Sequence, residues 1–432
     1  MIIRGQSPWR KHMDLKQQIT HIAKNAANAS RVLANLAASE KNKILKEMAE
    51  SLNKNKEAIL NANKKDIVLA KKKRLSAALI DRLTLDEKRI TDMADCLLSV
   101  AKLDDAAGVE IKSWVVPSGL KIHKVRVPIG VIAIIYESRP NVTSDCIGLC
   151  FKSGNSVILR GGSEALNSNI AIFKAIEEVI KKNNLPRGVI NLIAAKDRRA
   201  VDILVKLNDY IDLVMPRGGE ALIKKVVSLS RIPVIKHYKG ICHVYVDNYA
   251  NLNMAQNICF NAKVQRPGVC NAMESMLVHR AVAAKFLPGM INRFKEAGVE
   301  IRGCRLTKKI IKGEVKLAAE KDYRTEYLDL ILSVKVVDSM DEAIAHVNTY
   351  GSHHSDTIVT DDENNAREFL KKVDSACVYV NASTRFTDGN QFGMGAEIGI
   401  STDKLHARGP MGIEELTTYK YIIFGTGQIR TV

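Results

Sequence analysis

The sequence predicts an α/β fold with two successive α/β domains, the first of which contains a doubly wound parallel sheet. Residues 130–136 and 156–160 are continuous apolar runs without helical period, which is typical of strands buried on both faces. Amphipathic stretches alternate with such runs, and this rhythm favours parallel strands joined by helices. The 432 residues are 46% hydrophobic, enough for two or three domains.

The first hundred residues are expected to be helical. Apolar side chains recur at spacings of three and four from Leu15 to Leu36 and from Ile44 to Leu52, and helix is predicted to about Leu103. After the two strand runs, residues 170–180 have the same helical period. Further short strands of this domain are predicted at 189–194, 211–215 and 234–235.

The second half of the chain repeats the mixed pattern. Helices are predicted at 281–297 and 340–348. Strands are predicted at 243–246, 274–278, 330–337, 357–360 and 377–380. A turn signal at Lys239-Gly240 separates two strand runs, so we place the domain border there.

A hairpin interrupts the first domain. Residues 115–127 alternate apolar and polar side chains, as in an exposed hairpin, and Thr417–Ile429 could pair with it. We therefore expect residues 115–128 and 405–432 to form a flap through which the chain forms a homo-oligomer. Residues 1–12 are basic and polar, and we interpret them as an extension before the first helix.

The composition narrows the possible partners. The net charge of +18 would suit nucleic acid, an anionic membrane or small phosphorylated and carboxylated ligands. Aromatic residues make up only 5%, and neither an RNA-binding strand signature nor zinc-ligand spacing is present, which disfavours nucleic acid. No apolar run approaches about eighteen residues, so no membrane span is predicted. Eight cysteines without a Cys-x-x-Cys pair are typical of reduced thiols in the cytoplasm, and no metal site is predicted.

Cys270 is the candidate nucleophile. It lies in the polar stretch Gln-Arg-Pro-Gly-Val-Cys-Asn-Ala that starts at Gln265, where Pro267 and Gly268 favour a bend. A nucleophilic cysteine must be partly exposed and must lie beside groups that stabilise the developing charge. The alternative, a small buried thiol, fits the other seven cysteines better.

Polar residues follow the first strand of the predicted sheet, at the edge where open parallel sheets bind ligands. The Asn141 amide could donate to an oxyanion, or Asn141 could be a turn residue after proline. Glu137 and Arg139 could bind a substrate's ammonium and carboxylate, or could pair with each other.

Two Arg-Gly-Gly turns follow other strands of this sheet. Glycines allow close backbone approach, and an arginine at a helix N-terminus suits a phosphate. Although either turn alone would be weak, two turns at equivalent strand ends indicate a phosphate-rich cofactor. The residues are Arg160, Gly161, Gly162, Ser163 and Glu164, and Pro216, Arg217, Gly218 and Gly219.

The order of Asn141, the Arg160 turn and Cys270 resembles that of the aldehyde dehydrogenase superfamily. Three motifs narrow the resemblance to its gamma-glutamyl phosphate reductases: Tyr-Glu-Ser-Arg-Pro-Asn-Val-Thr from Tyr136, the Cys270 stretch, and Gly-Ala-Glu-Ile-Gly-Ile-Ser-Thr-Asp-Lys-Leu-His-Ala-Arg-Gly-Pro-Met-Gly from Gly395. The resemblance implies an aldehyde dehydrogenase fold with a Rossmann-like cofactor domain (13–114 and 129–238), a catalytic domain (239–385) and an oligomerisation hairpin.

The implied reaction is the reduction of L-glutamyl 5-phosphate by NADPH to L-glutamate 5-semialdehyde and phosphate, in proline biosynthesis. Glutamate 5-kinase is a possible partner. By this resemblance Cys270 forms a thioester while Asn141 and the Cys270 N–H hold the oxyanion. Arg160 favours the extra phosphate of NADPH, and Glu326 holds the nicotinamide ribose. The substrate carboxylate would bind Arg139, with Arg385 and Arg408 as weaker candidates.

Two departures from the relatives bear on the chemistry. Hydrolytic aldehyde dehydrogenases keep a glutamate that activates water, whereas this chain has His237-Tyr-Lys-Gly at that place. This disfavours the alternative of a hydrolytic NAD(P)-dependent semialdehyde dehydrogenase. His237 could act as a weak base, although a structural histidine is the simpler interpretation. His353 stands where the narrower family usually has glycine.

Overall fold

The computed structural model describes residues 14–313 and 315–430, which form two compact units. The first comprises the chain up to Lys236 with 394–399 and the segment from Met411 onward, and the second comprises His237–Gly393 and Ile400–Pro410. The second unit thus extends beyond residue 385 and takes in 405–410, which we had expected in the flap. Residues 400–410 belong there because β14 (Ile400–Ser401) pairs with β15 (Gly409–Pro410) and Arg408 binds Asp374.

A four-stranded parallel sheet forms the centre of the first unit. Its order is β5 (Ile190–Leu192), β4 (Ser156–Arg160), β3 (Val131–Tyr136) and β6 (Leu213–Arg217). All residues of β3 and β4 are buried, as their continuous apolar runs predicted. The prediction of a strand at 234–235 is wrong, because Val234 makes only an isolated bridge to Val214.

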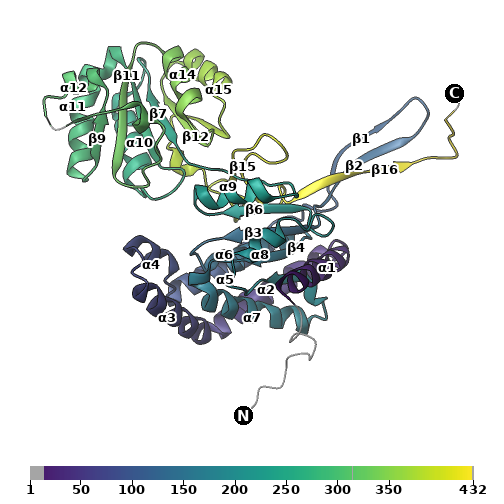
Figure 1. Ribbon diagram of the computed structural model, residues 1–432. Coiled ribbons are helices and arrows are strands. Elements are labelled where there is room, and N and C mark those ends of the chain that lie inside the picture. The colour runs from purple at the N-terminus through teal and green to yellow at the C-terminus, as the bar shows by residue number, and fades with distance from the viewer. Residues whose placement is uncertain (1–13, 314, 431–432) are drawn as a thin grey trace. The chain divides into compact units, whose positions relative to one another are not determined.

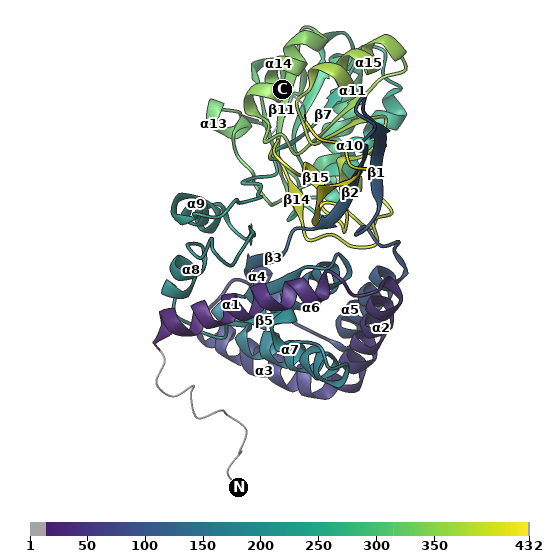
Figure 2. The same ribbon diagram turned by 90° about the vertical axis from the view of Figure 1, so that its right-hand side faces the viewer.

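Helices cover both faces of this sheet, which confirms the doubly wound arrangement. Side chains of α1 (Leu15–Leu33), α8 (Arg199–Leu204) and α9 (Glu220–Leu229) share one hydrophobic cluster with β3 and β6. The other helices of the unit are α2 (Ala38–Lys54), α3 (Lys56–Lys72), α4 (Ala77–Leu83), α5 (Glu87–Lys102), α6 (Asn141–Lys152) and α7 (Leu166–Lys182). Figure 2 shows α2, α5 and α6 side by side, in agreement with their contacts.

A three-stranded antiparallel sheet extends from the rest of the first unit (Figure 1). It contains β1 (Glu110–Val115), β2 (Lys121–Pro128) and β16 (Thr417–Phe424), with β2 in the middle. The predicted hairpin and its pairing with the C-terminal segment are therefore present. Large apolar side chains on β16 remain exposed, among them Tyr421, Ile423 and Phe424.

The second unit contains a seven-stranded parallel sheet. Its order is β10 (Lys316–Leu317), β9 (Glu300–Gly303), β11 (Ile331–Val337), β8 (Met273–His279), β7 (Cys242–Val246), β12 (Ser355–Val359) and β13 (Cys377–Val380). The helices are α10 (Leu252–Val264), α11 (Arg280–Glu296), α12 (Arg305–Ile310), α13 (Glu320–Tyr323), α14 (Met340–Tyr350) and α15 (Glu363–Lys372). The sequence missed β9 and β10, because both are short and lack an apolar run.

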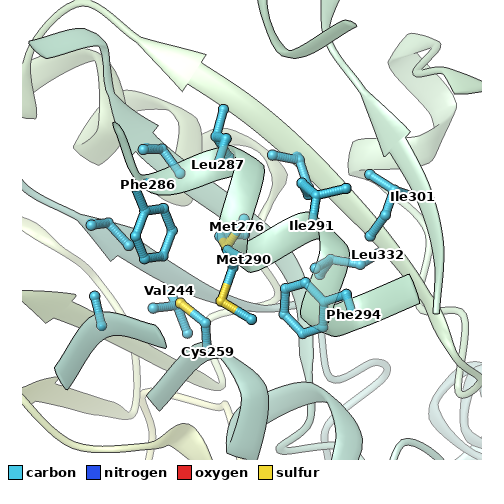
Figure 3. Packing of buried hydrophobic residues seen from close by; sticks show 14 of the residues in the cluster. Val244, Cys259, Met276, Phe286, Leu287, Met290, Ile291, Phe294, Ile301 and Leu332 are labelled. Atoms are coloured by element: carbon cyan, nitrogen blue, oxygen red, sulfur yellow. The ribbon is translucent and has the colours of Figure 1, made fainter. Parts of the chain in front are cut away.

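The core of the second unit lies where α10 and α11 pack on the sheet (Figure 3). Phe286, Met290 and Phe294 of α11 lie against Val244 and Met276 of the strands, and all five are fully buried. Burying each such side chain contributes roughly 1.5–3 kcal/mol. This packing supports the strand ends and the loops that follow them. No helix in the described residues is apolar enough over enough length to span a membrane.

Candidate active site

The Cys270 loop joins α10 to β8 in the second unit, and the Cys270 side chain is partly exposed. The Cys242 thiol donates to the Cys270 carbonyl (3.2 Å). Asn271 anchors the next position, because its Nδ2 donates to the Thr387 carbonyl (2.7 Å) and its own carbonyl accepts from the Thr384 hydroxyl (2.8 Å). The loop is therefore held from both sides while Cys270 remains partly exposed.

Buried cysteines elsewhere provide a contrast. Cys146, Cys150, Cys242 and Cys259 are fully buried, and burial raises the pKa of each thiol, which keeps it protonated and inert. Cys270 differs from these four in its partial exposure, which a nucleophile requires. Cys96, Cys304 and Cys377 are also partly exposed, so the expectation of a buried thiol holds for only four of the other seven cysteines.

Gly240 packs directly against the Cys270 backbone. A Cβ at this position would overlap the Cys270 carbonyl oxygen and lie 2.5 Å from its Cα. The Gly240 N–H donates to Oε1 of Glu326 (2.8 Å), so this turn also fixes the glutamate expected to hold the nicotinamide ribose.

Gly240→Ala is expected to displace the Cys270 loop. Overpacking of this kind costs about 1–3 kcal/mol of unfolding free energy, and a displacement of about 1 Å at a reacting group costs about 100-fold in rate. Denaturant unfolding and kcat/KM measure the two effects. Gly289→Ala is the control, because a Cβ there meets only Gln256 Nε2 at 3.4 Å. Equal kcat/KM values for the two variants would contradict the expected displacement.

The arginines considered for the substrate have different surroundings. Arg385 donates from Nε to Gln265 (2.8 Å) and from Nη1 to Asn271, and it lines a cavity beside the Cys270 loop. Arg408 forms an ion pair with Asp374 (2.9 Å) and also donates to the Asp374 carbonyl (3.1 Å). Arg139 follows β3 in the first unit.

The two histidines singled out from the sequence are both tied to backbone carbonyls. His237 donates from Nδ1 to the Ile400 carbonyl (2.8 Å), and its ring lies 5.8 Å from that of buried His354. Burial and the nearby His237 lower the pKa of His354 to about 3. His353 has φ of +59° and donates to the Asp374 carbonyl. This left-handed conformation explains why glycine would be favoured there.

Asn141 is the first residue of α6, and its Nδ2 donates to Oδ2 of Asp145 (2.8 Å). Burial raises the pKa of Asp145 to about 6, opposed by the Asn141 hydrogen bond and the positive charge of Arg217. Cys96 of α5 also contacts Asp145. Sequence reasoning missed Asp145, because the helix that brings it one turn from Asn141 was not among the predicted elements.

The raised pKa of Asp145 should make stability depend on pH. The usual aspartate pKa is about 4, so between about pH 4 and 6 the folded chain keeps a proton that the unfolded chain has released, and stability falls as pH rises. Asp145→Asn removes this loss, and its amide oxygen can still accept from Asn141. As pH rises through this window, the free energy of unfolding of the variant should gain up to about 3 kcal/mol relative to wild type, from two pKa units at about 1.4 kcal/mol each. Denaturant unfolding at several pH values measures the difference, and parallel pH profiles would contradict it.

The two Arg-Gly-Gly turns meet around the loop after β3. The Ser138 backbone N–H and hydroxyl both donate to Oε1 of Glu164 (2.9 Å each), and the Gly219 N–H donates to Oε2 of Glu137 (3.0 Å). A Cβ on Gly218 would lie 2.6 Å from the Glu137 carboxyl carbon. Glu137 was considered for binding a substrate ammonium, but its carboxylate accepts a hydrogen bond from the Pro216–Gly219 turn.

Arg160 has the features of an anion-binding residue. Its side chain donates from Nη1 to the Gly161 carbonyl (3.0 Å), while its buried Nε has no hydrogen-bond partner. Burial lowers its pKa, and the charge of Arg198 acts in the same direction, opposed by Glu164. An unsatisfied donor and a second arginine at a glycine-rich strand end fit the phosphate of a dinucleotide. Arg198 was not found from the sequence.

Comparison with known proteins identifies the family. The model of the aldehyde dehydrogenase family matches residues 9–303 and 320–422. A gamma-glutamyl phosphate reductase of Thermodesulfovibrio yellowstonii is 57% identical over 418 residues, covering 97% of this chain and all of that protein. The chain belongs to the gamma-glutamyl phosphate reductases. The resemblance found in the sequence motifs is thereby confirmed.

Solved structures of this reductase family and of more distant aldehyde dehydrogenases have the same fold. The crystal structure of the gamma-glutamyl phosphate reductase from Thermotoga maritima matches with a TM-score of 0.93 and 47% identity, covering 96% of this chain and all of that one. The NADP complex of glyceraldehyde-3-phosphate dehydrogenase from Methanocaldococcus jannaschii matches with a TM-score of 0.66 and 19% identity, covering 95% of each chain. This second likeness concerns the fold alone.

Proposed function

We propose that this reductase converts L-glutamyl 5-phosphate to L-glutamate 5-semialdehyde, with release of phosphate, as a step of proline biosynthesis. The observation that carries the proposal is the partly exposed Cys270 on an anchored polar loop, in a chain 57% identical to a reductase of that name. The reaction needs an accessible thiol to take the acyl group, and the loop supplies one.

The residues suggest a covalent route. The Cys270 thiolate attacks the acyl carbon, the carbon–oxygen bond to phosphate breaks, and a glutamyl thioester remains. As the resemblance implies, the Asn141 amide and the Cys270 N–H donate to the oxyanion. Bound NADPH supplies a hydride. The thiohemiacetal formed on Cys270 then collapses, the carbon–sulfur bond breaks, and the aldehyde leaves.

Phosphate dependence distinguishes this activity from hydrolysis. His237 stands at the place of the hydrolytic glutamate, and its Nδ1 donates to the Ile400 carbonyl, which orients the ring. The absence of the glutamate itself is what argues against water activation. In the reverse direction, NADP⁺ reduction with glutamate 5-semialdehyde should require phosphate. Equal rates without phosphate would favour the hydrolytic semialdehyde dehydrogenase instead.

NADPH is the cofactor that best fits the first unit. Arg160 to Glu164 and Pro216 to Gly219 would hold its phosphates and ribose at the strand ends. The family resemblance implies that Glu326 holds the nicotinamide ribose. The unpartnered Arg160 Nε and nearby Arg198 support a ligand with an additional phosphate.

Arg160→Ala is expected to lower the preference for NADPH over NADH. A charge-assisted hydrogen bond contributes about 1.5–3 kcal/mol, so the ratio of the two kcat/KM values should fall roughly 10- to 100-fold. Arg187→Ala, at the start of a short turn in the same unit, is the control. An unchanged ratio would remove Arg160 from cofactor recognition.

The remaining assignments concern location and partners. The exposed apolar residues of β16 and the outer strands of the three-stranded sheet suit a homo-oligomer interface. The eight free cysteines suit a reducing cytoplasm. Because an acyl phosphate hydrolyses readily, direct supply by glutamate 5-kinase would be useful.

A further inference from the structure

A polar cavity of about 280 Å³ lies beside the Cys270 loop, entirely within the second unit. Arg385 connects it to the loop, because it donates to Asn271, the residue after Cys270, and to Gln265. The cavity wall contains one cation, one carboxylate, four side-chain amides and one aromatic ring: Arg385, Asp388, Asn261, Gln265, Asn390, Gln391 and Phe386.

Charges in this wall are close enough to interact. Burial and the charge of Arg266 lower the pKa of Arg385, whereas Asp388 and Cys270 act in the opposite direction. The guanidinium thus interacts electrostatically with Asp388 and with Cys270. Oδ1 of Asp388 accepts from the backbone N–H groups of Asn390 (3.0 Å) and Gln391 (3.3 Å), which fixes the carboxylate in a turn.

The pairing of opposite charges selects the kind of ligand. An arginine alone would accept any carboxylate or phosphate, but a carboxylate at the same cavity repels a multiply charged anion. A zwitterion satisfies both groups. Phe386, which is 49% exposed, supplies an apolar surface for a short methylene chain.

We propose that this cavity holds the α-amino acid end of the substrate, with Arg385 binding the α-carboxylate and Asp388 binding the α-ammonium. The proposal rests on the proposed function and names the specificity residues of the same site. Sequence reasoning gave Arg385 as a minor candidate and missed Asp388, since only the folded loop brings the two around one cavity.

Substrate analogues test the two contacts separately in the NADP⁺- and phosphate-dependent direction. Relative to glutamate 5-semialdehyde, 5-oxopentanoate lacks the ammonium and 4-aminobutanal lacks the carboxylate. Asp388→Asn keeps the oxygen that accepts from Asn390 and Gln391 but removes the charge. We expect it to raise KM for glutamate 5-semialdehyde roughly 10- to 100-fold, with little change for 5-oxopentanoate.

Arg385→Met tests the contact to the α-carboxylate. It should raise KM for the two carboxylate-bearing aldehydes and leave that for 4-aminobutanal and for phosphate unchanged. The controls are Asp361→Asn and Arg280→Met, which change exposed residues of the same unit. A rise of KM for phosphate alone in Arg385→Met would assign the cavity to the leaving group and overturn the proposal. If Asp388→Asn raised KM equally for glutamate 5-semialdehyde and for 5-oxopentanoate, Asp388 would have a merely structural role.

Protection of Cys270 from alkylation tests the cavity assignment without requiring turnover. L-glutamate should slow alkylation of Cys270 in the wild-type protein and in both controls, but not in Asp388→Asn. If wild type failed to reduce NADP⁺ with phosphate and glutamate 5-semialdehyde, the proposed function would fail while this protection could still be scored. Absence of protection in wild type would overturn the cavity assignment.

Discussion

Cys270→Ala is expected to abolish reduction, with kcat lowered by at least about 10⁴-fold, as for other enzymes that lose their nucleophile. Without the sulfur no thioester forms, so phosphate is not displaced and the acyl group has no covalent route to the hydride. NADPH binding should be nearly unchanged, because the proposed phosphate-binding turns lie in the first unit. Steady-state kinetics and a fluorescence titration with NADPH measure the two properties.

Cys259→Ala is the matched control for this substitution. Cys259 is a fully buried thiol in the core of the same unit, so its loss should lower stability while activity is retained. Near-normal turnover of Cys270→Ala, or equal loss of activity in the two variants, would rule out Cys270 as the nucleophile.

Asn141→Ala is expected to lower kcat by about 100- to 1,000-fold, the usual effect of removing one oxyanion donor. The residual activity should exceed that of Cys270→Ala, since thioester chemistry remains possible. Rapid mixing of the protein with aldehyde and NADP⁺ should show slower formation of the acyl-enzyme.

Asp145→Asn distinguishes loss of the Asn141 amide from disturbance of the residue that accepts its hydrogen bond. It keeps Asn141 and an acceptor for its Nδ2, so it should retain most of the rate that Asn141→Ala loses. If the two variants lost the same rate, the damage would lie in the structure around α6, and Asn141 would not be the oxyanion donor.

Most of the fold could be predicted because the buried strands have distinctive sequences. Val131–Tyr136 is apolar throughout and lies in the middle of its sheet. Glu300–Gly303 has alternating polar residues and only four positions, so nothing distinguished it from a loop. Val234 follows Pro233, which lacks an N–H. Pro233 can therefore only accept a hydrogen bond, from the Val214 N–H to its carbonyl, and this explains why the pairing stops at an isolated bridge.

The site was predicted less completely, because much of it depends on partners that are distant in sequence. Cys270 and the two Arg-Gly-Gly turns stood out by composition alone. Glu137 was considered for the substrate, but its carboxylate accepts from Gly219, 82 residues away. Gly240 was expected only to mark a turn near the border of the two units, which lies at Lys236–His237, but its missing side chain also makes room for the Cys270 backbone. Such roles follow from packing, which a single sequence does not display.

The central claim, transfer of the acyl group through Cys270, can be tested by withholding phosphate. Wild-type protein mixed with glutamate 5-semialdehyde and NADP⁺ should produce a burst of about one NADPH per chain and then stop, because the thioester has no acceptor. Peptide mass spectrometry should find one glutamyl group on Cys270. Continued turnover without phosphate, or a glutamyl group on another residue, would contradict the claim.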